Sequence, residues 1–422
     1  MKKKILIHSI VFSPDGVSTA YLYNDIALKF SESGYEVVVL TTTPHYNVLA
    51  DEVSKQPMHP KFWGLYLESR FHNIKVIHVP QKKFKNFFLR GLGFLYWHFL
   101  SVLLGLGQKN ISLILSPSPP LTIGVINLII GKLKRAKVIY NVQEIYPDFL
   151  INQGGLKIKP IIKLLKSMER LVYNKSNAVT TIDSIFYNTI ASRFKNPSKL
   201  HIIPNFVDTE LFKPLKEVDI NLDKKLFPKK DGVLKVMYAG NIGHAQDWKP
   251  LLAAAEKLIH EKIEFWVVGE GVMKEYLEKE IKLNDLHNIH LIPYQPREQM
   301  PSLIAYADIH FIFMAPEMEG QGFPSKVYTI MACAKPLLVL SGKNTPIHNF
   351  LSSAECAILI DSPEFLQKCD LLISSLQSLS KDSQNCLSMG HKGYRLIEEH
   401  YSKRAVTQQY VNLADLVLNK DL

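Results

Sequence analysis

The sequence of 422 residues lacks several patterns that would assign a class of function at once. It has four cysteines, all in the second half, and none forms a C-x-x-C pair, so neither a disulfide framework nor a cysteine-bound zinc site is expected. No G-x-G-x-x-G sequence is present, which argues against a dinucleotide-binding fingerprint. What remains is the composition of an ordinary globular protein, 47% hydrophobic and 21% charged.

Positive charge is concentrated in the first half of the chain. Residues 1–200 contain 26 Lys and Arg against 11 Asp and Glu, whereas the remaining residues contain 24 against 28. This asymmetry indicates an anionic partner for the first half, namely a membrane surface, a nucleic acid or a phosphate-bearing acceptor, or else a basic face exposed to solvent. Its aromatic residues gather in one apolar run and do not alternate with basic residues, so a nucleic-acid partner is not expected.

Apolar runs that alternate with amphipathic segments predict an α/β fold. Residues 5–12 are typical of a buried parallel strand, and a loop, an amphipathic helix over 20–33 and a second strand over 36–42 follow. The first run ends in Pro-Asp-Gly without a small-residue cleavage site, which favours a strand over a signal peptide. Because the chain is too long for one core, two domains of about 200 residues each are expected.

Polar residues follow the strand that we expect over residues 137–142. Gln143 and Glu144 come directly after it, at the carboxyl edge of a sheet where ligands of α/β proteins bind. Either side chain could bind or polarise a substrate hydroxyl. The alternative is a pair of loop side chains in solvent.

The run from Lys82 to Leu106 is unusual because basic residues lead into a charge-free stretch, residues 91–107, rich in aromatic side chains. Three alternatives stay open: a buried helix of the first domain, an interfacial membrane anchor, and a transmembrane helix that would be slightly short. A second basic segment, from Lys157 to Arg170, supports contact with an anionic membrane surface.

The stretch from Glu317 to Leu340 organises the second half. A polar lead-in reaches Pro324, Ser325 and Lys326, which open a predicted helix over 327–332, and a buried strand over 337–340 follows. Ser325 is expected to cap the helix, and Lys326 places a cation where free backbone N–H groups favour an anion. The alternative is an ordinary capped helix between two strands.

Several linked motifs resemble those of the retaining glycosyltransferases of family 4. The run IPNFVDTELFKP, residues 203–214, resembles the interdomain signature of that family, with Phe206 in place of the usual Gly. Further motifs follow in the order of the family and are listed here with their residues: VMYAGNIG (236–243), FWVVGEG (265–271), IHLIPYQP (289–296) and the Pro-Ser-Lys form of the nucleotide-binding helix (324–326). The resemblance spans essentially the whole chain and extends to enzymes that add amino or deoxy sugars to O-antigen repeats.

The resemblance implies the GT-B fold, in which two Rossmann-like α/β domains face each other across a deep cleft. The expected acceptor-binding domain comprises residues 1–203 with a helix over 401–422 that crosses back to it. The expected donor-binding domain comprises residues 204–400. A nucleotide-diphosphate sugar, with UDP favoured over GDP, is the implied donor. No metal is required by this fold class, which agrees with the absence of an Asp-x-Asp motif.

The resemblance also assigns site residues. Glu144, Glu319 and Lys326 are the candidates for catalytic roles, and Gln143 and Glu144 are the candidates for acceptor binding. The candidates for donor and nucleotide binding are Gly16, Gly240, Asn241, Gly243, Gly269, Glu270, Tyr294, Gln321, Gly322, Ser325, Lys326 and Thr329.

Two departures from the family pattern bear on these assignments. Thr329 and Gln321 stand where the family has the two glutamates of its Glu-x7-Glu motif, so Glu319 or Glu317 takes the role of the sugar-contacting carboxylate. The cation that the family often carries in its glycine-rich loop is absent here, and Lys326 replaces it.

The resulting prediction is a metal-independent, retaining glycosyltransferase. It moves a sugar to a polyprenyl-diphosphate-linked saccharide in bacterial O-antigen, lipopolysaccharide or capsule biosynthesis, at the inner face of the cytoplasmic membrane. Two other functions stay open: a sugar-nucleotide epimerase of the same fold, and a non-enzymatic scaffold of a polysaccharide assembly complex.

Overall fold

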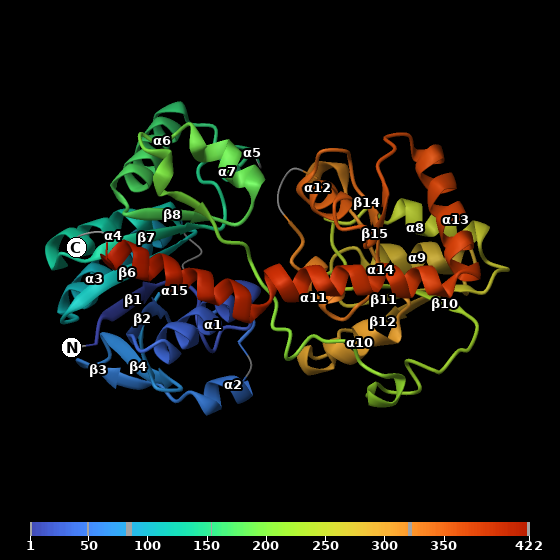
Figure 1. Cartoon of the computed structure of the whole chain (residues 1–422), viewed down its shortest axis with the longest axis horizontal. Coiled ribbons are helices and arrows are strands. Elements are labelled where there is room, and N and C mark those ends of the chain that lie inside the picture. The colour runs from blue at the N-terminus through green and yellow to red at the C-terminus, as the bar shows by residue number, and fades with distance from the viewer. Residues whose placement is uncertain (1, 49, 82–86, 153, 320–322, 420–422) are drawn as a thin grey trace. The chain divides into compact units, whose positions relative to one another are not determined.

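The computed structural model describes residues 2–48, 50–81, 87–152, 154–319 and 323–419 (Figure 1). Contacts divide the chain into two compact units, which we call unit 1 (residues 1–205 and 406–422) and unit 2 (residues 206–405). The boundaries expected from the sequence lie after residues 203 and 400.

Unit 1 is built on a nine-stranded sheet with the strand order β3-β4-β5-β2-β1-β6-β7-β8-β9. The pairs β3–β4 and β4–β5 are antiparallel, and the other neighbours are parallel. The strands are β1 (Lys4–His8), β2 (Glu36–Thr42), β3 (His59–Lys61), β4 (Tyr66–Phe71), β5 (Ile74–Val79), β6 (Ile111–Ser118), β7 (Lys137–Val142), β8 (Ala178–Thr181) and β9 (Leu200–Ile202).

Helices cover both faces of this sheet. They are α1 (Ser18–Glu32), α2 (Ala50–Lys55), α3 (Phe87–Gly107), α4 (Leu121–Lys134), α5 (Asp148–Asn152), α6 (Lys159–Lys175), α7 (Ser184–Ala191) and α15 (Lys403–Asn419). Helix α4 packs against both α3 and α6. Helix α1 links β1 to β2, whereas α4 links β6 to β7 in the other direction along the sheet. Because parallel crossovers are right-handed, α1 and α4 therefore cover different faces.

Helix α15, red in Figure 1, begins in unit 2, and its residues from Val406 onward belong to unit 1. There the Tyr410 hydroxyl accepts a hydrogen bond from the Asn141 amide at 3.1 Å, and Tyr35 is hydrogen-bonded to Asp415. The last helix therefore returns to the first unit, as the resemblance implied.

Unit 2 is built on a six-stranded parallel sheet with the strand order β12-β11-β10-β13-β14-β15. The strands are β10 (Leu234–Ala239), β11 (Ile263–Val268), β12 (Ile289–Ile292), β13 (Ile309–Phe313), β14 (Leu337–Leu340) and β15 (Ala357–Ile360). The α-helices are α8 (Lys249–Lys257), α9 (Lys274–Leu283), α10 (Met300–Tyr306), α11 (Lys326–Ala332), α12 (Pro346–Ser352), α13 (Phe365–Lys381) and α14 (Ser383–Leu396).

Most strand residues of unit 2 are buried, because helices cover the sheet on both sides, and the partly exposed ones lie mainly in the edge strands β12 and β15. Trp266 and Phe313 are among the largest fully buried side chains of the chain. This explains why the strands appear in the sequence as continuous apolar runs rather than as alternating ones. The predicted α/β fold with two parallel-sheet domains is confirmed.

Some expected elements are confirmed and others are wrong in extent. The strands over 36–42 and 337–340 are observed with the predicted bounds. The first strand ends at His8 rather than at residue 12, because the Ser9 side chain bonds to the N–H and the carbonyl of Val11 and so takes the place of strand pairing there. The short elements α2, β3 and β4 were not predicted, since they have no long apolar run.

The charge-free run is part of helix α3, whose observed bounds are Phe87–Gly107. It carries both fully buried side chains, such as Trp97, and strongly exposed ones, such as Phe99. Within the described ranges, none of the helices has the length and apolar character that crossing a membrane would require. The basic residues at 82–85 that precede α3 lie outside the described residues.

Candidate functional site

The carboxyl edge of the unit 2 sheet contains a topological switch point between β10 and β13. The chain runs from β10 through β11 to β12 on one side of the sheet and from β13 through β14 to β15 on the other. Loops that leave two such neighbouring strands diverge, and the crevice between them is where open α/β sheets bind ligands. The Gly240 loop follows β10, and the segment that leads into α11 follows β13.

Lys326, the first residue of α11, lies at the end of β10. Its Nζ donates to the Ala239 carbonyl at 3.2 Å and lies 3.8 Å from the centre of the Tyr238 ring. Among the described residues, no carboxylate forms an ion pair with this ammonium group. Burial lowers the pKa of Lys326 from 10.5 to about 7. The fold therefore holds a cation at the switch point without a counterion from the described protein residues.

Glycines bring the backbone close to this lysine. A Cβ atom at Gly240 would lie 2.5 Å from the Lys326 Nζ, and one at Gly269 would lie 1.9 Å from the Gly240 carbonyl oxygen. Both glycines have positive φ values, 151° and 145°, which L side chains rarely adopt. The ends of β10 and β11 thus lie closer to each other and to Lys326 than a residue with a side chain at position 240 or 269 would allow.

The remainder of the Gly240 loop is held in place by two aromatic side chains. The Tyr238 hydroxyl donates to the Asn241 carbonyl at 2.7 Å, and the Trp248 indole N–H donates to the Gly243 carbonyl at 3.1 Å. The Asn241 side chain stays exposed. These bonds give the loop a fixed shape, which a backbone site for an anion requires.

The polar lead-in to α11 provides a carboxylate at the same edge. Glu319 accepts a hydrogen bond from the Gly342 N–H at 2.7 Å through Oε1, just beyond the end of β14. The Thr329 hydroxyl donates to the Lys326 carbonyl at 2.9 Å, one turn into the helix. Gln321 and Gly322 lie outside the described residues.

Ser325 occupies the N-cap position of α11, but its side chain accepts no cap hydrogen bond. The predicted capping role is therefore wrong. Ser325 already has helical dihedral angles, φ −57° and ψ −23°, whereas a capping side chain normally extends from β-region backbone.

Glu270 and Tyr294 lie at the periphery of this edge. The Ile242 N–H donates to the Glu270 carbonyl at 2.8 Å, which joins Glu270 to the Gly240 loop. The Glu270 carboxylate pairs with Lys274 at 2.7 Å, and the Lys274 ammonium and the Tyr294 N–H lower the pKa of Glu270. Tyr294 is 64% exposed, so its ring is available for stacking.

Unit 1 has its own switch point, between β1 and β6, and the Gly16 loop follows β1 there. A Cβ atom at Gly16 would lie 2.5 Å from the Asn47 carbonyl oxygen. The neighbouring Asp15 is buried, and its Oδ1 accepts hydrogen bonds from the N–H groups of His45 and Tyr46 at 2.8 and 2.9 Å. Asp15 therefore joins the loops after β1 and β2.

Gln143 is engaged inside unit 1. Its side-chain amide exchanges hydrogen bonds with the Asn205 amide at 3.1 and 3.0 Å, and its Nε2 also donates to Asn141 at 2.9 Å. These bonds use the amide groups that an acceptor would otherwise contact. The geometry therefore favours a positioning role for Gln143.

The carboxyl group of Glu144, in contrast, has one polar neighbour that affects its pKa, the side chain of Tyr146. Burial raises the pKa of Glu144, and the Tyr146 hydrogen bond acts in the opposite direction. Burial and the nearby carboxylate also raise the pKa of Tyr146 to about 12. Glu144 is thus a half-buried carboxyl group at the carboxyl edge of the sheet.

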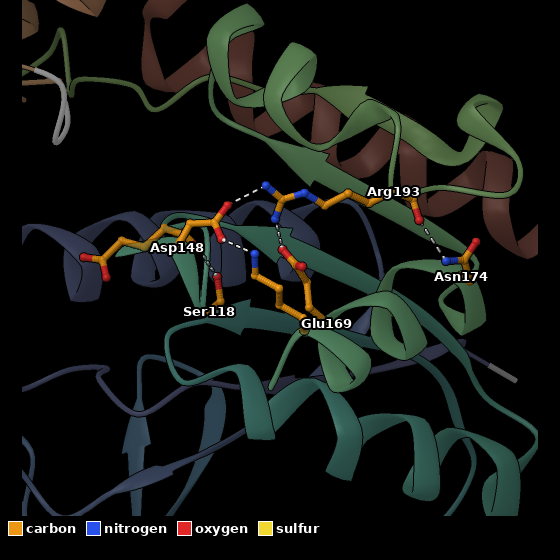
Figure 2. Close-up of polar contacts among 7 residues, drawn as sticks. Ser118, Asp148, Glu169, Asn174 and Arg193 are labelled. Carbon is orange, nitrogen blue, oxygen red and sulfur yellow. Dashed lines mark hydrogen bonds and ion pairs between the residues drawn. The ribbon is translucent and has the colours of Figure 1, made fainter. Parts of the chain in front are cut away.

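A partly buried ion network lies near Glu144 in unit 1 (Figure 2). The Arg193 guanidinium donates to Asp148 and to Glu169, each at 2.5 Å, and Lys166 lies 3.9 Å from the other Asp148 oxygen. Figure 2 shows Arg193 reaching between the two carboxylates. This network joins α5 and α6, which follow β7, to the segment just after α7, which follows β8.

Within the described parts of the chain, no three His, Cys, Asp or Glu side chains form a group that could hold a metal ion. Independence from metal remains a prediction. At its switch point, unit 2 contains the Lys326 cation, a glycine loop of fixed shape and the Glu319 carboxylate, which together make this edge of the sheet a candidate anion-binding site.

Comparisons with known proteins identify the class of this site. The model of Glycosyltransferase Family 4 matches residues 21–211, and the model of Glycosyl transferases group 1 matches residues 219–395. Together the two matches take in most of the chain. The chain therefore belongs to the glycosyltransferases of this family and is a GT-B glycosyltransferase.

Curated relatives and solved structures agree with this assignment. The chain is 21% identical to the putative colanic acid biosynthesis glycosyl transferase WcaI of Escherichia coli, with 97% of this chain and 99% of that protein covered. It is 24% identical to the probable glycosyltransferase WbjE of Pseudomonas aeruginosa over 51% of this chain and 54% of that one. Anabaena HepE in complex with UDP has a similar fold, with a TM-score of 0.70 at 14% identity over 99% of this chain and all of that one.

Two residues, one at the candidate site of unit 2 and one beside the Gly16 loop of unit 1, were not identified from the sequence. Tyr238 lies within the quoted motif VMYAGNIG, yet only the fold shows that its ring lies under Lys326. Asp15 precedes the predicted Gly16. Its burial and its hydrogen bonds to the His45 and Tyr46 N–H groups could not be predicted, because these donors lie in another loop. A polar residue directly before a glycine that follows a strand is the signal that could have identified it.

Proposed function

We propose that this chain is a retaining glycosyltransferase that transfers a sugar from a UDP-sugar to a saccharide carried on polyprenyl diphosphate, in the biosynthesis of O-antigen or capsule. Relatives support the elements of this proposal. Structures of HepE contain UDP, UDP with glucose, and UDP-glucose. WaaG, with a TM-score of 0.64 at 12% identity over 97% of this chain and 99% of that one, is involved in lipopolysaccharide biosynthesis. An acceptor of this kind is anchored in a bilayer, so the enzyme works at the inner face of the cytoplasmic membrane.

The single observation that carries the proposal is the state of Lys326. A buried ammonium without a counterion is unfavourable in the ligand-free protein, and burial accordingly lowers the pKa of Lys326 to about 7. A diphosphate bound at the end of β10 would supply the missing negative charge and restore the protonated form. Binding of the donor then offsets the unfavourable free energy of burying the lysine.

The proposed chemistry centres on the leaving diphosphate. As the bond between the anomeric carbon and the phosphate oxygen breaks, negative charge builds on the diphosphate and the sugar gains oxocarbenium character. Lys326 and backbone N–H groups of the Gly240 loop stabilise that charge, and the removal of one such donor typically costs about 3 kcal/mol. The acceptor hydroxyl attacks from the same face, and its proton passes to the departing phosphate, so no enzymatic nucleophile and no metal ion is needed.

The carboxyl groups have supporting roles in this proposal. Glu319, whose Oε1 is fixed by the Gly342 N–H, keeps its second oxygen for a sugar hydroxyl. Glu270 and Thr329 are proposed to contact the nucleoside, and Tyr294 to stack on the base. Glu144 orients the acceptor, and Gln143 holds the loop that carries Glu144.

The proposal is tested by thermal-shift and calorimetric titration with UDP, GDP, ADP, dTDP and CMP, each with and without Mg²⁺. We expect selective stabilisation by UDP, equal with and without the metal, and a loss of affinity of about 100-fold in Lys326→Met. Lys249→Met is the matched control, because Lys249 is an exposed lysine of the same unit. Product analysis with UDP-sugars, amino and deoxy sugars included, then identifies the transferred group.

Three results would contradict the proposal. The absence of stabilisation by any nucleotide would favour the scaffold alternative. Conversion of the donor to another sugar nucleotide without acceptor would favour the epimerase. Inversion at the anomeric carbon of the product would exclude the retaining mechanism.

A further inference from the structure

Helix α3 leaves a broad apolar surface exposed. Six large side chains on it are between 46% and 65% exposed: Leu89, Leu92, Leu95, Tyr96, Phe99 and Leu103. Five of them, all except Leu95, recur at steps of three or four residues and so form one stripe. The opposite side is anchored in the core by Trp97 and Leu100, which are 0% and 3% exposed. The outer side of a surface helix is normally polar, so this apolar face requires an explanation.

The neighbouring helices α4 and α6 also expose apolar side chains. Gly105 of α3 packs against Ile130 of α4, and α4 in turn packs against α6. On α4, Ile129 and Leu133 are 46% and 63% exposed. On α6, the exposed apolar residues are Ile161, Leu164 and Leu171. Figure 1 shows α3 and α4 next to each other in unit 1. We call the exposed side of α3, α4 and α6 the apolar layer.

Helices α3 and α4 carry no acidic residue. From Ser69 to Gln143 the sequence contains no Asp or Glu, but 11 Lys and Arg. Three of these cations, Lys132, Lys134 and Arg135, lie at the end of α4 next to Leu133. A face that combines apolar side chains with cations and no anions is complementary to a surface in which apolar chains lie beneath anionic groups.

Helix α6 adds a cationic hollow of about 450 Å³, lined by Lys159, Lys163, Lys166 and Arg170 with Ile162 and Ser167. Among the described residues, Lys166 alone of these four cations has a carboxylate within 4 Å, namely Asp148 at 3.9 Å. The only acidic residue of α6, Glu169, is turned inward to Arg193 (Figure 2). The outer side of α6 therefore presents uncompensated positive charge of the size that a phosphate group can enter.

We infer that the apolar layer docks onto an anionic phospholipid bilayer, with the exposed residues of α3 and α4 at the level of the acyl chains and the α6 hollow at the phosphates. A second copy of the chain is a poorer occupant. In a twofold dimer each patch meets itself, so cations would face cations around the apolar contact. Because Trp97 holds α3 in the core, the helix lies along the surface by its outer side and stays part of unit 1.

The docking goes beyond the proposed function, because it does not depend on which sugar is transferred or on whether transfer occurs. Its test is sedimentation of the full-length protein with phosphatidylcholine vesicles, with and without 30% phosphatidylglycerol, in physiological salt. We expect binding to the anionic vesicles and at least tenfold weaker binding to the neutral ones, since each basic residue near such a surface contributes about fivefold.

Two triple variants separate the contributions. Leu92→Glu/Leu95→Glu/Phe99→Glu is expected to weaken vesicle binding at least 30-fold. Lys159→Gln/Lys163→Gln/Arg170→Gln is expected to remove most of the preference for phosphatidylglycerol. The control Val218→Glu/Leu283→Glu/Leu366→Glu places the same charges at exposed apolar positions of unit 2 and is expected to bind like the unaltered protein.

Other results would overturn the inference. These are an absence of binding to anionic vesicles, equal losses in the unit 2 control, or a concentration-dependent dimer that the α3 variant dissociates. UDP stabilisation is measured on the same samples as a check of folding and of the donor site. Vesicle binding without a UDP response would contradict the proposed sugar transfer and leave the docking intact. A UDP response without vesicle binding would contradict the docking and leave the use of a UDP-sugar donor intact.

Discussion

Each unit holds a cation that is at least partly buried, Arg193 in unit 1 and Lys326 in unit 2, and the two cations have opposite kinds of partners. Arg193 in unit 1 has two carboxylate partners, and these outweigh burial and raise its pKa. Lys326 in unit 2 has a carbonyl and an aromatic ring, and burial lowers its pKa to about 7. The comparison distinguishes a cation that joins helices from a cation that the fold leaves available to a ligand.

The physical reason lies in the cost of burying a charge. A buried charge that is neutralised within the protein supports the fold but has no remaining attraction for a ligand. A buried charge without a partner destabilises the ligand-free protein and becomes favourable only when an anion arrives. Stability and ligand binding are thus separated between the two units, and this separation can be measured.

The largest expected effect is on stability, in Arg193→Met. The change leaves Glu169, which is 2% exposed, without its cation, and the removal of one partner of a buried pair typically costs about 3 kcal/mol or more. Thermal or urea denaturation should show unit 1 destabilised by about 3 kcal/mol. The control Arg170→Met, which removes an exposed arginine of the same unit, should change little. Equal stability of the two variants would contradict the stabilising role of Arg193 in unit 1.

Lys326→Met should have the opposite sign in the absence of ligand. Below about pH 7 the lysine is protonated in both the folded and the unfolded chain, so the folded state bears the full cost of the buried charge. As the pH rises from about 7 towards 10.5, the folded form is neutral while the unfolded form is still charged, and the cost fades. Calorimetry at pH 6 should show unit 2 stabilised by about 2 kcal/mol in the variant, with a smaller gain at pH 9.

The affinity for UDP should depend on pH in a way that reports the same lysine. Above pH 7 the diphosphate has to bind together with a proton for Lys326, so the Kd should rise about tenfold per pH unit until the pKa of the complexed lysine is reached. Isothermal titration in two buffers of different ionisation enthalpy would measure the proton uptake directly. Lys326→Arg, which stays charged at all these pH values, should flatten the profile. A steep profile in that variant would assign the dependence to another group.

The smallest effect is expected from Lys274→Met, which removes the partner of Glu270. This pair links an exposed carboxylate to its neighbour one helical turn away, and exposed pairs of this kind contribute little to stability. The melting temperature should stay within 1 °C of the unaltered protein, about the precision of the measurement. A large loss would show that this exposed pair also stabilises the fold and would contradict the contrast between paired and unpaired cations.

Much of the fold could be predicted from the sequence because its signals are local. The continuous apolar runs at 36–42 and 337–340 specify buried parallel strands, and both are observed with the predicted bounds. The elements between residues 50 and 71 were missed because they are short and pair antiparallel at the edge of the sheet, where no periodic pattern is required. Ser325 was wrongly expected to cap α11, since capping depends on backbone dihedral angles that the residue type alone does not determine.

By itself, the sequence determined the class of the protein: two α/β units, a motif order that resembles family 4 glycosyltransferases, and a strongly basic first half. It also singled out Lys326 as the cation of the site. Only the tertiary structure decided what surrounds that cation, because Tyr238, Gly240 and Ala239 contact it from almost 90 residues away in the chain. The structure likewise decided which side of α3 is exposed, because periodicity cannot orient a helix that is apolar on all sides, whereas packing against α4 and the sheet does so.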